Sequence, residues 1–220
     1  MSLHPQLLHL LHLASPALPI GAFHFSQGLE HAVEAGWVRD EVTTLEWISG
    51  LAQGALATLD LPVLARLYQT QQHAQEEEVL RWDALLIASR ETRELRAEDR
   101  HMGAALRKIL LEIAPELRVP GHASYAAAFA AACGHWQVPL QDALQAYAWA
   151  WSENQVLAAV KLVPLGQTAG QRVLNALIPR LAEMATRATH MTDDQIGYCS
   201  VMQSMASARH ERQYTRLFRS

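Results

Sequence analysis

Cysteine is almost absent from this chain, which has only Cys133 and Cys199 among its 220 residues. The two cysteines are far apart and form no C-x-x-C pair, so the sequence indicates neither a disulfide framework nor a thiolate metal site. A chain without disulfides suits a reducing compartment, and we expect it to be cytoplasmic.

Charge is also scarce, because Asp, Glu, Lys and Arg make up 18% of the residues, against about 25% in typical soluble domains. The net charge of −4 argues against a nucleic-acid partner, which would need a basic face to neutralise phosphates. Half of the residues are hydrophobic. We therefore expect an apolar part of the surface to bind a partner protein.

Motifs for catalysis and for membrane insertion are missing. The sequence has no phosphate-binding P-loop, no G-x-S-x-G nucleophile motif, no H-E-x-x-H zinc motif and no dinucleotide fingerprint. Ser26 and His24 are two residues apart, so on a helix they point to different sides and do not form a nucleophile and base. The leucine-rich start at 7–13 is interrupted by histidines and runs into prolines, which is not typical of a signal peptide or membrane span. We predict no enzymatic activity, no cofactor and no membrane association.

Helical periodicity fills nearly the whole chain, while sustained strand-like alternation is missing. This predicts an all-α, bundle-like fold of about nine to ten helices in one domain, residues 1–220. Pro179 predicts a break or kink inside the helix that contains it. Helix starts are predicted at Asp40 or Thr43, Asp60 with Pro62, Pro139, Pro164, and Asp193 or Asp194.

The stretch 13–38 is the most constrained part of the sequence. Pro16 and Pro19 prevent a helix from running through it, and Gly21 supplies backbone freedom just beyond. Apolar residues then return at helical spacing until Gly36, a plausible helix C-terminus. We predict a turn followed by a short helix.

Charged residues stand out in three parts of the sequence. The run 90–100 has four arginines and four acidic residues, and their spacing predicts a mixed lattice of charges on a solvated helix face, with Arg90 beside Glu94. Lys161 lies among apolar neighbours. Its charge either interacts favourably with the dipole at a helix C-terminus or contacts a partner. The segment 206–220 either docks on the chain's own core or becomes ordered against a partner.

His9 and His12, spaced i and i+3, lie on one predicted helix face. Imidazole pairs bind nickel or zinc, but a metal site needs three or four ligands and no acidic residue or cysteine lies nearby. We favour ordinary surface or core histidines over a metal site.

Four ordered blocks resemble the family of the urease accessory protein UreF. They are P-I-G-A-F-H-F-S-Q-G-L-E at 19–30 with V-E-A-G-W-V at 33–38, R-E-T-R-E-L-R at 90–96, A-V-K-L-V-P-L-G-Q at 159–167, and A-S-A-R-H-E-R-Q-Y-T-R-L-F-R-S at 206–220. Together they span the chain, which makes the resemblance more specific than any single motif.

The resemblance implies a non-catalytic, homodimeric chaperone in urease maturation. With the protein UreD, also called UreH, it recruits the GTPase UreG to apo-urease for GTP-dependent nickel insertion. It implies that the tail 206–220 contacts UreD through Arg209, His210, Glu211, Tyr214, Arg216, Leu217, Phe218 and Ser220. It also implies UreG contacts at Glu94, Arg96 and Lys161, and a dimer contact at Gln145, Tyr147 and Trp149.

Two other functions stay open at this point. The protein could stimulate GTP hydrolysis by UreG through an arginine such as Arg96 or Arg209. It could also carry nickel directly on His9 and His12.

Overall fold

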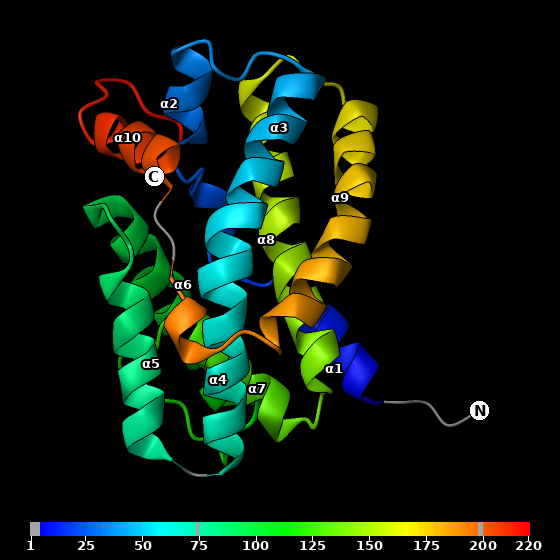
Figure 1. Ribbon diagram of the computed structural model, residues 1–220, viewed down its shortest axis with the longest axis vertical. Helices are drawn as coiled ribbons and strands as arrows, with labels where there is room; N and C mark the ends of the chain where they lie inside the picture. Colours follow the sequence, from blue (N-terminus) through cyan, green and yellow to red (C-terminus); the bar gives the residue numbers. More distant parts are fainter. Residues whose placement is uncertain (1–4, 74, 198–199) are drawn as a thin grey trace.

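The computed structural model describes residues 5–73, 75–197 and 200–220, and helices dominate them (Figure 1). No strand occurs within these residues, which confirms the predicted all-α fold. Cys199 lies outside the described residues. The α-helices are α1 (Pro5–Leu13), α2 (Leu29–Glu34), α3 (Glu41–Leu51), α4 (Leu61–Gln72), α5 (Glu76–Ala88), α6 (Arg93–Ile113), α7 (Tyr125–His135), α8 (Leu140–Leu162), α9 (Gln167–Ala188) and α10 (Val201–His210).

One long helix runs through the middle of the molecule, because α3 continues through a π-helix at Ala52–Asp60 into α4 (Figure 1). Asp40 caps its start as predicted, since its side chain accepts a hydrogen bond from the Thr43 amide at 2.8 Å. The start predicted at Asp60 is wrong, because Asp60 has helical backbone angles and makes no capping bond.

Pro62 lies inside this long helix, where a proline normally disrupts the hydrogen bonding. A proline inside a helix cannot bond the carbonyl four residues earlier, and its ring crowds that carbonyl. Here that carbonyl belongs to Thr58, in the wider π turn, and it accepts a hydrogen bond from the Gly197 amide at 3.0 Å. This carbonyl, which Pro62 cannot bond, is therefore paired with a distant segment.

The helix Glu41–Gln72 is also the one described helix that is long and apolar enough to cross a membrane by length and composition. Of its most apolar window, 78% is buried inside the structure. A buried core helix passes the same test.

The helices α5 and α6 form a pair that covers residues 76–113. The Thr92 side chain caps α6 by accepting a hydrogen bond from the Leu95 amide at 3.2 Å. Gly103 of α6 lies against the chain at Ala123 and Ser124, where an added Cβ would be 2.6 Å from the Ser124 carbonyl carbon. The absence of a side chain at Gly103 therefore lets α6 pack directly on the start of α7.

The alanine-rich α7 lies in the centre of the larger hydrophobic core, to which α1 and α3 to α9 contribute. Its short side chains let α4 and α6 pack closely against it. α8 begins after Pro139 as predicted. α9 continues through Pro179 as one helix, so of the predicted break or kink only the break is wrong.

Two other predicted helix starts are also wrong. α9 begins at Gln167, because Pro164 lies in the preceding turn. The last helix begins after Ser200, whose side chain accepts a hydrogen bond from the Gln203 amide, whereas Asp193 and Asp194 form only a short 3-10 turn.

Candidate partner-binding surface

The predicted turn at 13–38 brings α2 against α10 (Figure 1). Gly21 and Gly28 have φ of 76° and 84°, in the left-handed region that favours glycine. At Gly28 an added Cβ would also lie 3.0 Å from the Ser207 amide nitrogen of α10. The short helix α2 and the glycine before it therefore form the seat for the C-terminal segment.

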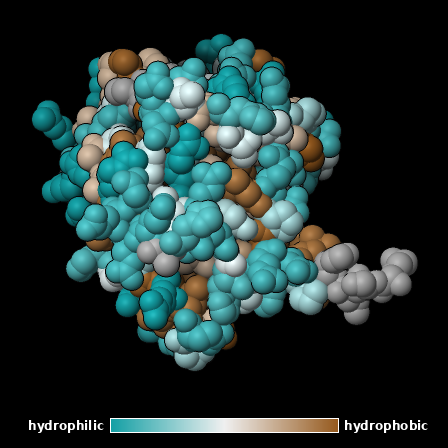
Figure 2. Space-filling view, turned by 60° about the horizontal axis from the view of Figure 1, so that its bottom comes forward, coloured by the Kyte–Doolittle hydropathy of each residue, from teal (hydrophilic) through white to brown (hydrophobic). Residues whose placement is uncertain are grey.

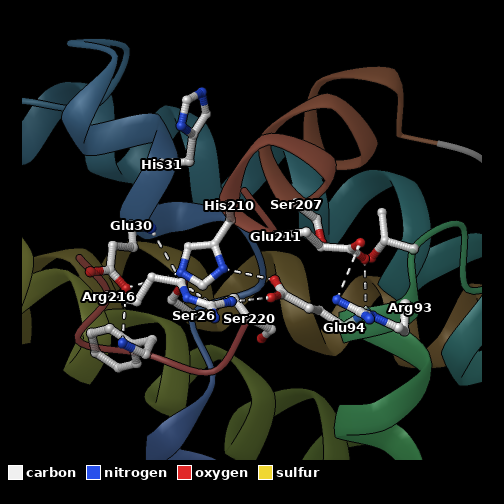
Figure 3. Close-up of polar contacts among 12 residues, drawn as sticks. Ser26, Glu30, His31, Arg93, Glu94, Ser207, His210, Glu211, Arg216 and Ser220 are labelled. Atoms are coloured by element: carbon white, nitrogen blue, oxygen red, sulfur yellow. Dashed lines mark hydrogen bonds and ion pairs between the residues drawn. The ribbon is translucent and has the colours of Figure 1, made fainter. Parts of the chain in front are cut away.

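His210, at the end of α10, is fully buried between two carboxylates (Figure 3). Its Nε2 lies 3.1 Å from Glu30 Oε2 on α2, and its Nδ1 lies 2.7 Å from Glu94 Oε2 on α6. Each imidazole nitrogen therefore has a carboxylate oxygen within hydrogen-bond distance. Three segments that are far apart in the sequence therefore meet at one side chain.

The same two carboxylates hold the chain that follows α10. Glu30 accepts hydrogen bonds from the backbone amides of Leu217 and Phe218 at 2.7 and 2.8 Å. Glu94 accepts one from Arg216 at 2.8 Å. We call the group of Glu30, Glu94, His210 and Arg216 the tail clamp. Because Glu30 and Glu94 are largely buried, these charge-assisted bonds compete little with water.

Ser220 is buried in a second contact. Its carbonyl accepts hydrogen bonds from the amide and the hydroxyl of Ser26, and its own hydroxyl donates to Glu98 at 3.0 Å. Gln27 also donates to Glu98, at 2.7 Å, and accepts from the Trp151 indole at 3.0 Å. Burial raises the pKa of Glu98 to about 7.

A buried ion cluster lies beneath this contact, next to a cavity of about 90 Å³. Arg90 pairs with Asp60 of the long helix and with Asp99 of α6, the latter at 2.9 Å. Burial raises the pKa of Asp60, although the Arg90 charge opposes that change. Arg90 compensates two buried carboxylates and fixes the α5–α6 turn against the long helix.

The predicted mixed lattice at 90–100 is therefore wrong. Glu94, Glu98 and Asp99 are buried and turned inward, and Arg90 pairs with Asp60 and Asp99 rather than with Glu94. The helix spacing indicated which residues share a face. It gave no sign that the acidic face would meet the tail and the long helix.

The tail docks on the chain's own core, which is one of the two interpretations of its sequence. Of the predicted UreD contacts, His210, Phe218 and Ser220 are buried in this arrangement. Tyr214 is fully exposed and Leu217 is 66% exposed. The exposed side chains of Val201, Met202 and Met205 on α10 add apolar surface to the same C-terminal segment.

Two other predicted UreD contacts differ in exposure. Arg209 is exposed, and its guanidinium lies over the Trp37 ring at 5.9 Å. Glu211 is half-buried, accepts a hydrogen bond from the Glu94 amide at 3.3 Å and lies 3.9 Å from Arg93. The docked tail thus presents polar and apolar groups outward while the tail clamp holds its inner side.

The predicted UreG contacts lie in different environments. Lys161 is exposed near the end of α8, with its ammonium 5.8 Å from the Phe23 ring and 5.7 Å from the Phe218 ring. Arg96 is half-buried and donates to the Arg90 carbonyl at 2.5 Å. Glu94, only 7% exposed, is occupied by the tail clamp.

Of the three predicted dimer residues, two line a surface groove and one is buried in the core. Gln145 and Trp149 line an open groove of about 820 Å³, together with residues of α1 and α9. Leu7 and Leu11 on α1 and Ile178 on α9 are exposed apolar members of this groove. Figure 2 shows hydrophobic residues exposed among polar ones near the N-terminal end. Tyr147, by contrast, is buried and stacks on Tyr125 at 5.3 Å.

The histidines predicted as an alternative nickel site stay apart from other ligands. The His9 ring stacks on Trp136 at 4.3 Å, and His12 is exposed. Within the described residues, no group of three or more His, Cys, Asp or Glu side chains could hold a metal ion. His24 and Ser26 also differ, since His24 is exposed and Ser26 is buried against Ser220.

Glu30, Ser26, Gln27, Glu98, Asp60 and Asp99 were not predicted as site residues. No sequence pattern marks these residues, because most of the contacts that define them join segments far apart in the chain. Only the tertiary contacts identify their partners.

Comparison with known proteins places the chain in a family. The model of the UreF family matches residues 38–178. The chain is 46% identical over 213 residues to a urease accessory protein UreF of Alkalilimnicola ehrlichii, covering 94% of this chain and 93% of that protein. It is 42% identical to a UreF of Teredinibacter turnerae, covering 98% and 99%, and 46% identical to one of Pseudomonas putida, covering 97% of each. The chain therefore belongs to the UreF family of urease accessory proteins, and its role lies in urease maturation.

Proposed function

We propose that this protein is a non-catalytic, cytoplasmic scaffold that, with UreD, recruits the GTPase UreG to apo-urease for nickel insertion. In this proposal residues 1–220 act as one domain, and the tail 206–220 is the UreD-binding segment. Scaffolding requires rigid presentation of contact residues, because ordering them on binding would cost affinity.

The docked tail is the observation that carries the proposal. Its inner side is held by the tail clamp, while Tyr214 and Leu217 are exposed at its surface. Exposed apolar side chains in one segment do not stabilise the fold of the chain itself, and they typically mark a protein-binding surface. Aromatic residues in a preorganised segment are typical binding anchors.

The UreG contact is proposed for Arg96 and Lys161. Lys161 lies near Phe218, so the contact would be close to the tail and respond to its docking. We propose that Glu94 does not contact UreG directly. Its carboxylate bonds His210 and Arg216, so it would act only by holding the tail in place.

The homodimer is proposed to use the groove between α1, α8 and α9. Gln145 and Trp149 line it, whereas Tyr147 supports the helix from within the core. Sedimentation analysis of Leu11→Glu tests this proposal. The variant is expected to be monomeric at concentrations where wild type and the surface control Leu80→Glu are dimeric. A dimeric Leu11→Glu protein would exclude this groove.

Co-purification with UreD, followed by addition of UreG, tests the scaffold. A chain ending at Met205 also removes His210, which leaves Glu30 and Glu94 buried without partners and risks misfolding. Tyr214→Ala with Leu217→Ala avoids that problem, because both side chains are exposed.

The double variant should lose UreD while Leu80→Ala, a similarly exposed leucine on α5, retains it. Binding of UreD by the double variant at wild-type strength would contradict the proposed tail contact. Failure of the folded wild type to bind UreD would contradict the scaffold itself.

Two measurements separate the alternative functions. Single-turnover hydrolysis of GTP by UreG should be unchanged by a scaffold, whereas an activating arginine would give an increase of roughly a thousandfold or more that Arg96→Ala or Arg209→Ala removes. Equilibrium dialysis against nickel, for wild type and the His9→Ala, His12→Ala variant, tests whether the protein itself carries nickel on these histidines.

A further inference from the structure

The outward face of α6 concentrates arginine. Arg93, Arg96, Arg100 and Arg107 fall within roughly 60° of the helix circumference, at 100° per residue. Arg93 and Arg100 are exposed, and the other two are half-buried. Exposed Ala97 and Ala104 lie beside them on the same side of the helix. We call the four arginines and two alanines the α6 stripe.

The acidic residues of the same helix do not neutralise the α6 stripe. Glu94, Glu98 and Asp99 are buried and already engaged with the tail, Gln27 and Arg90. Glu112 is the one acidic residue of α6 that is exposed. A solvated helix face usually carries charges of both signs. In α6 the arginines lie on the outward face, and the buried acidic residues lie on the inward face.

The arginines of the α6 stripe are weakly engaged by the rest of the protein. Arg93 lies 3.9 Å from Glu211, and Arg107 donates to the Val119 carbonyl at 3.4 Å. Arg96 donates to a backbone carbonyl. For Arg100, the described residues provide no ion-pair partner. Four guanidinium groups therefore keep donors available for a partner's carboxylates.

The stripe is also continuous with the docked tail. Arg216 bonds Glu94, and Glu211 faces Arg93, so the tail runs along the first turns of α6. α6 has five of the chain's 18 Lys and Arg residues although the net charge is −4. The basic side of an acidic protein thus lies beside its proposed binding segment.

We propose that the α6 stripe is a docking surface for an acidic protein face, with its arginines binding carboxylates and its alanines allowing close approach. From Arg93 to Arg107 it extends about 21 Å, a length that suits a helix laid along it. The inference rests on the proposed function, in which Arg96 contacts UreG, and it extends that contact to Arg93, Arg100 and Arg107. Arginine suits this task because its planar fork binds carboxylates in pairs.

Charge reversal tests the surface. Arg100→Glu with Arg107→Glu is compared with Arg39→Glu with Arg187→Glu, exposed arginines outside α6, so that both variants change the net charge equally. Circular dichroism checks that both fold. The affinity of each UreD complex for UreG is then measured at low and high ionic strength.

The α6 variant should bind UreG at least about tenfold more weakly at low salt, with a flatter salt dependence, while the control stays near wild type. Equal affinity of both variants would overturn the α6 stripe as a docking surface and leave the scaffold intact. If wild type assembles with neither partner, the proposed function fails and this inference fails with it.

A labelled single-stranded RNA probe decides between two classes of acidic partner. We expect no binding by wild type at physiological salt. Tight binding that the α6 variant loses and the control keeps would make the occupant a nucleic acid and would overturn the proposal.

Discussion

Glu30→Gln is the sharpest test of the tail clamp. In the wild type, Glu30 Oε1 accepts from the Leu217 amide at 2.7 Å, and Oε2 accepts from the Phe218 amide at 2.8 Å and lies 3.1 Å from His210. Glutamine offers one acceptor oxygen and one amino group. Whichever way the side chain turns, a donor then faces a donor, and the negative charge opposite His210 is lost.

The expected magnitude follows from these contacts. A hydrogen bond to a charged group contributes about 1.5 to 3 kcal/mol, and the Glu30→Gln variant would lose at least one such bond and weaken another. We expect tail docking to be weaker by about 3 kcal/mol, which is roughly a hundredfold in the docking equilibrium. Phe218 burial and the Ser220 contacts are unchanged, so the rest of the fold should stay intact.

Hydrogen–deuterium exchange read by mass spectrometry measures this change. Peptides covering 211–220 should exchange roughly a hundredfold faster in Glu30→Gln, while peptides from α8 keep their protection. Glu34→Gln is the matched control, because Glu34 lies on the same helix with an exposed side chain. Wild-type protection of the tail in Glu30→Gln would refute the reasoning that this carboxylate holds it.

Three further changes test the interior. Glu98 has a pKa raised to about 7 in the folded state. The unfolded chain loses this proton above about pH 4.3, so the free energy of unfolding decreases as the pH rises from about 4.3 to 7. Thermal unfolding of Glu98→Gln should match wild type near pH 4 and exceed it by about 3 kcal/mol at pH 8; an equal difference at both pH values would contradict the linkage. Arg90→Met leaves Asp60 and Asp99 buried without a cation, and denaturant titration should give a loss of about 3 to 5 kcal/mol; a stable variant would mean that the cluster is well hydrated. Gly103→Ala should destabilise by about 3 kcal/mol or more, because its Cβ meets the backbone at the start of α7. Gly50→Ala, on an exposed and open helix position, should stabilise by about 0.5 to 1 kcal/mol, and equal effects of the two changes would exclude close packing at Gly103.

The sequence determined the local features of this protein, because those depend on neighbours along the chain. Helical periodicity gave the all-α class, Asp40 gave the cap of α3, and Pro139 marked the start of α8. The ordered motif blocks, which are a property of the sequence itself, led to the UreF family. These features need no knowledge of which helix packs on which.

Tertiary structure decided the pairing of distant groups. Asp60 looked like a helix cap, but its carboxylate pairs with Arg90, 30 positions away. The helix continues past Pro62, and the Thr58 carbonyl accepts a hydrogen bond from the Gly197 amide. Glu94 looked like a surface charge, but it is buried against His210, 116 positions away. Spacing along a helix says which residues share a face. Which face is buried depends on the segment that packs against it, and that is a property of the whole fold.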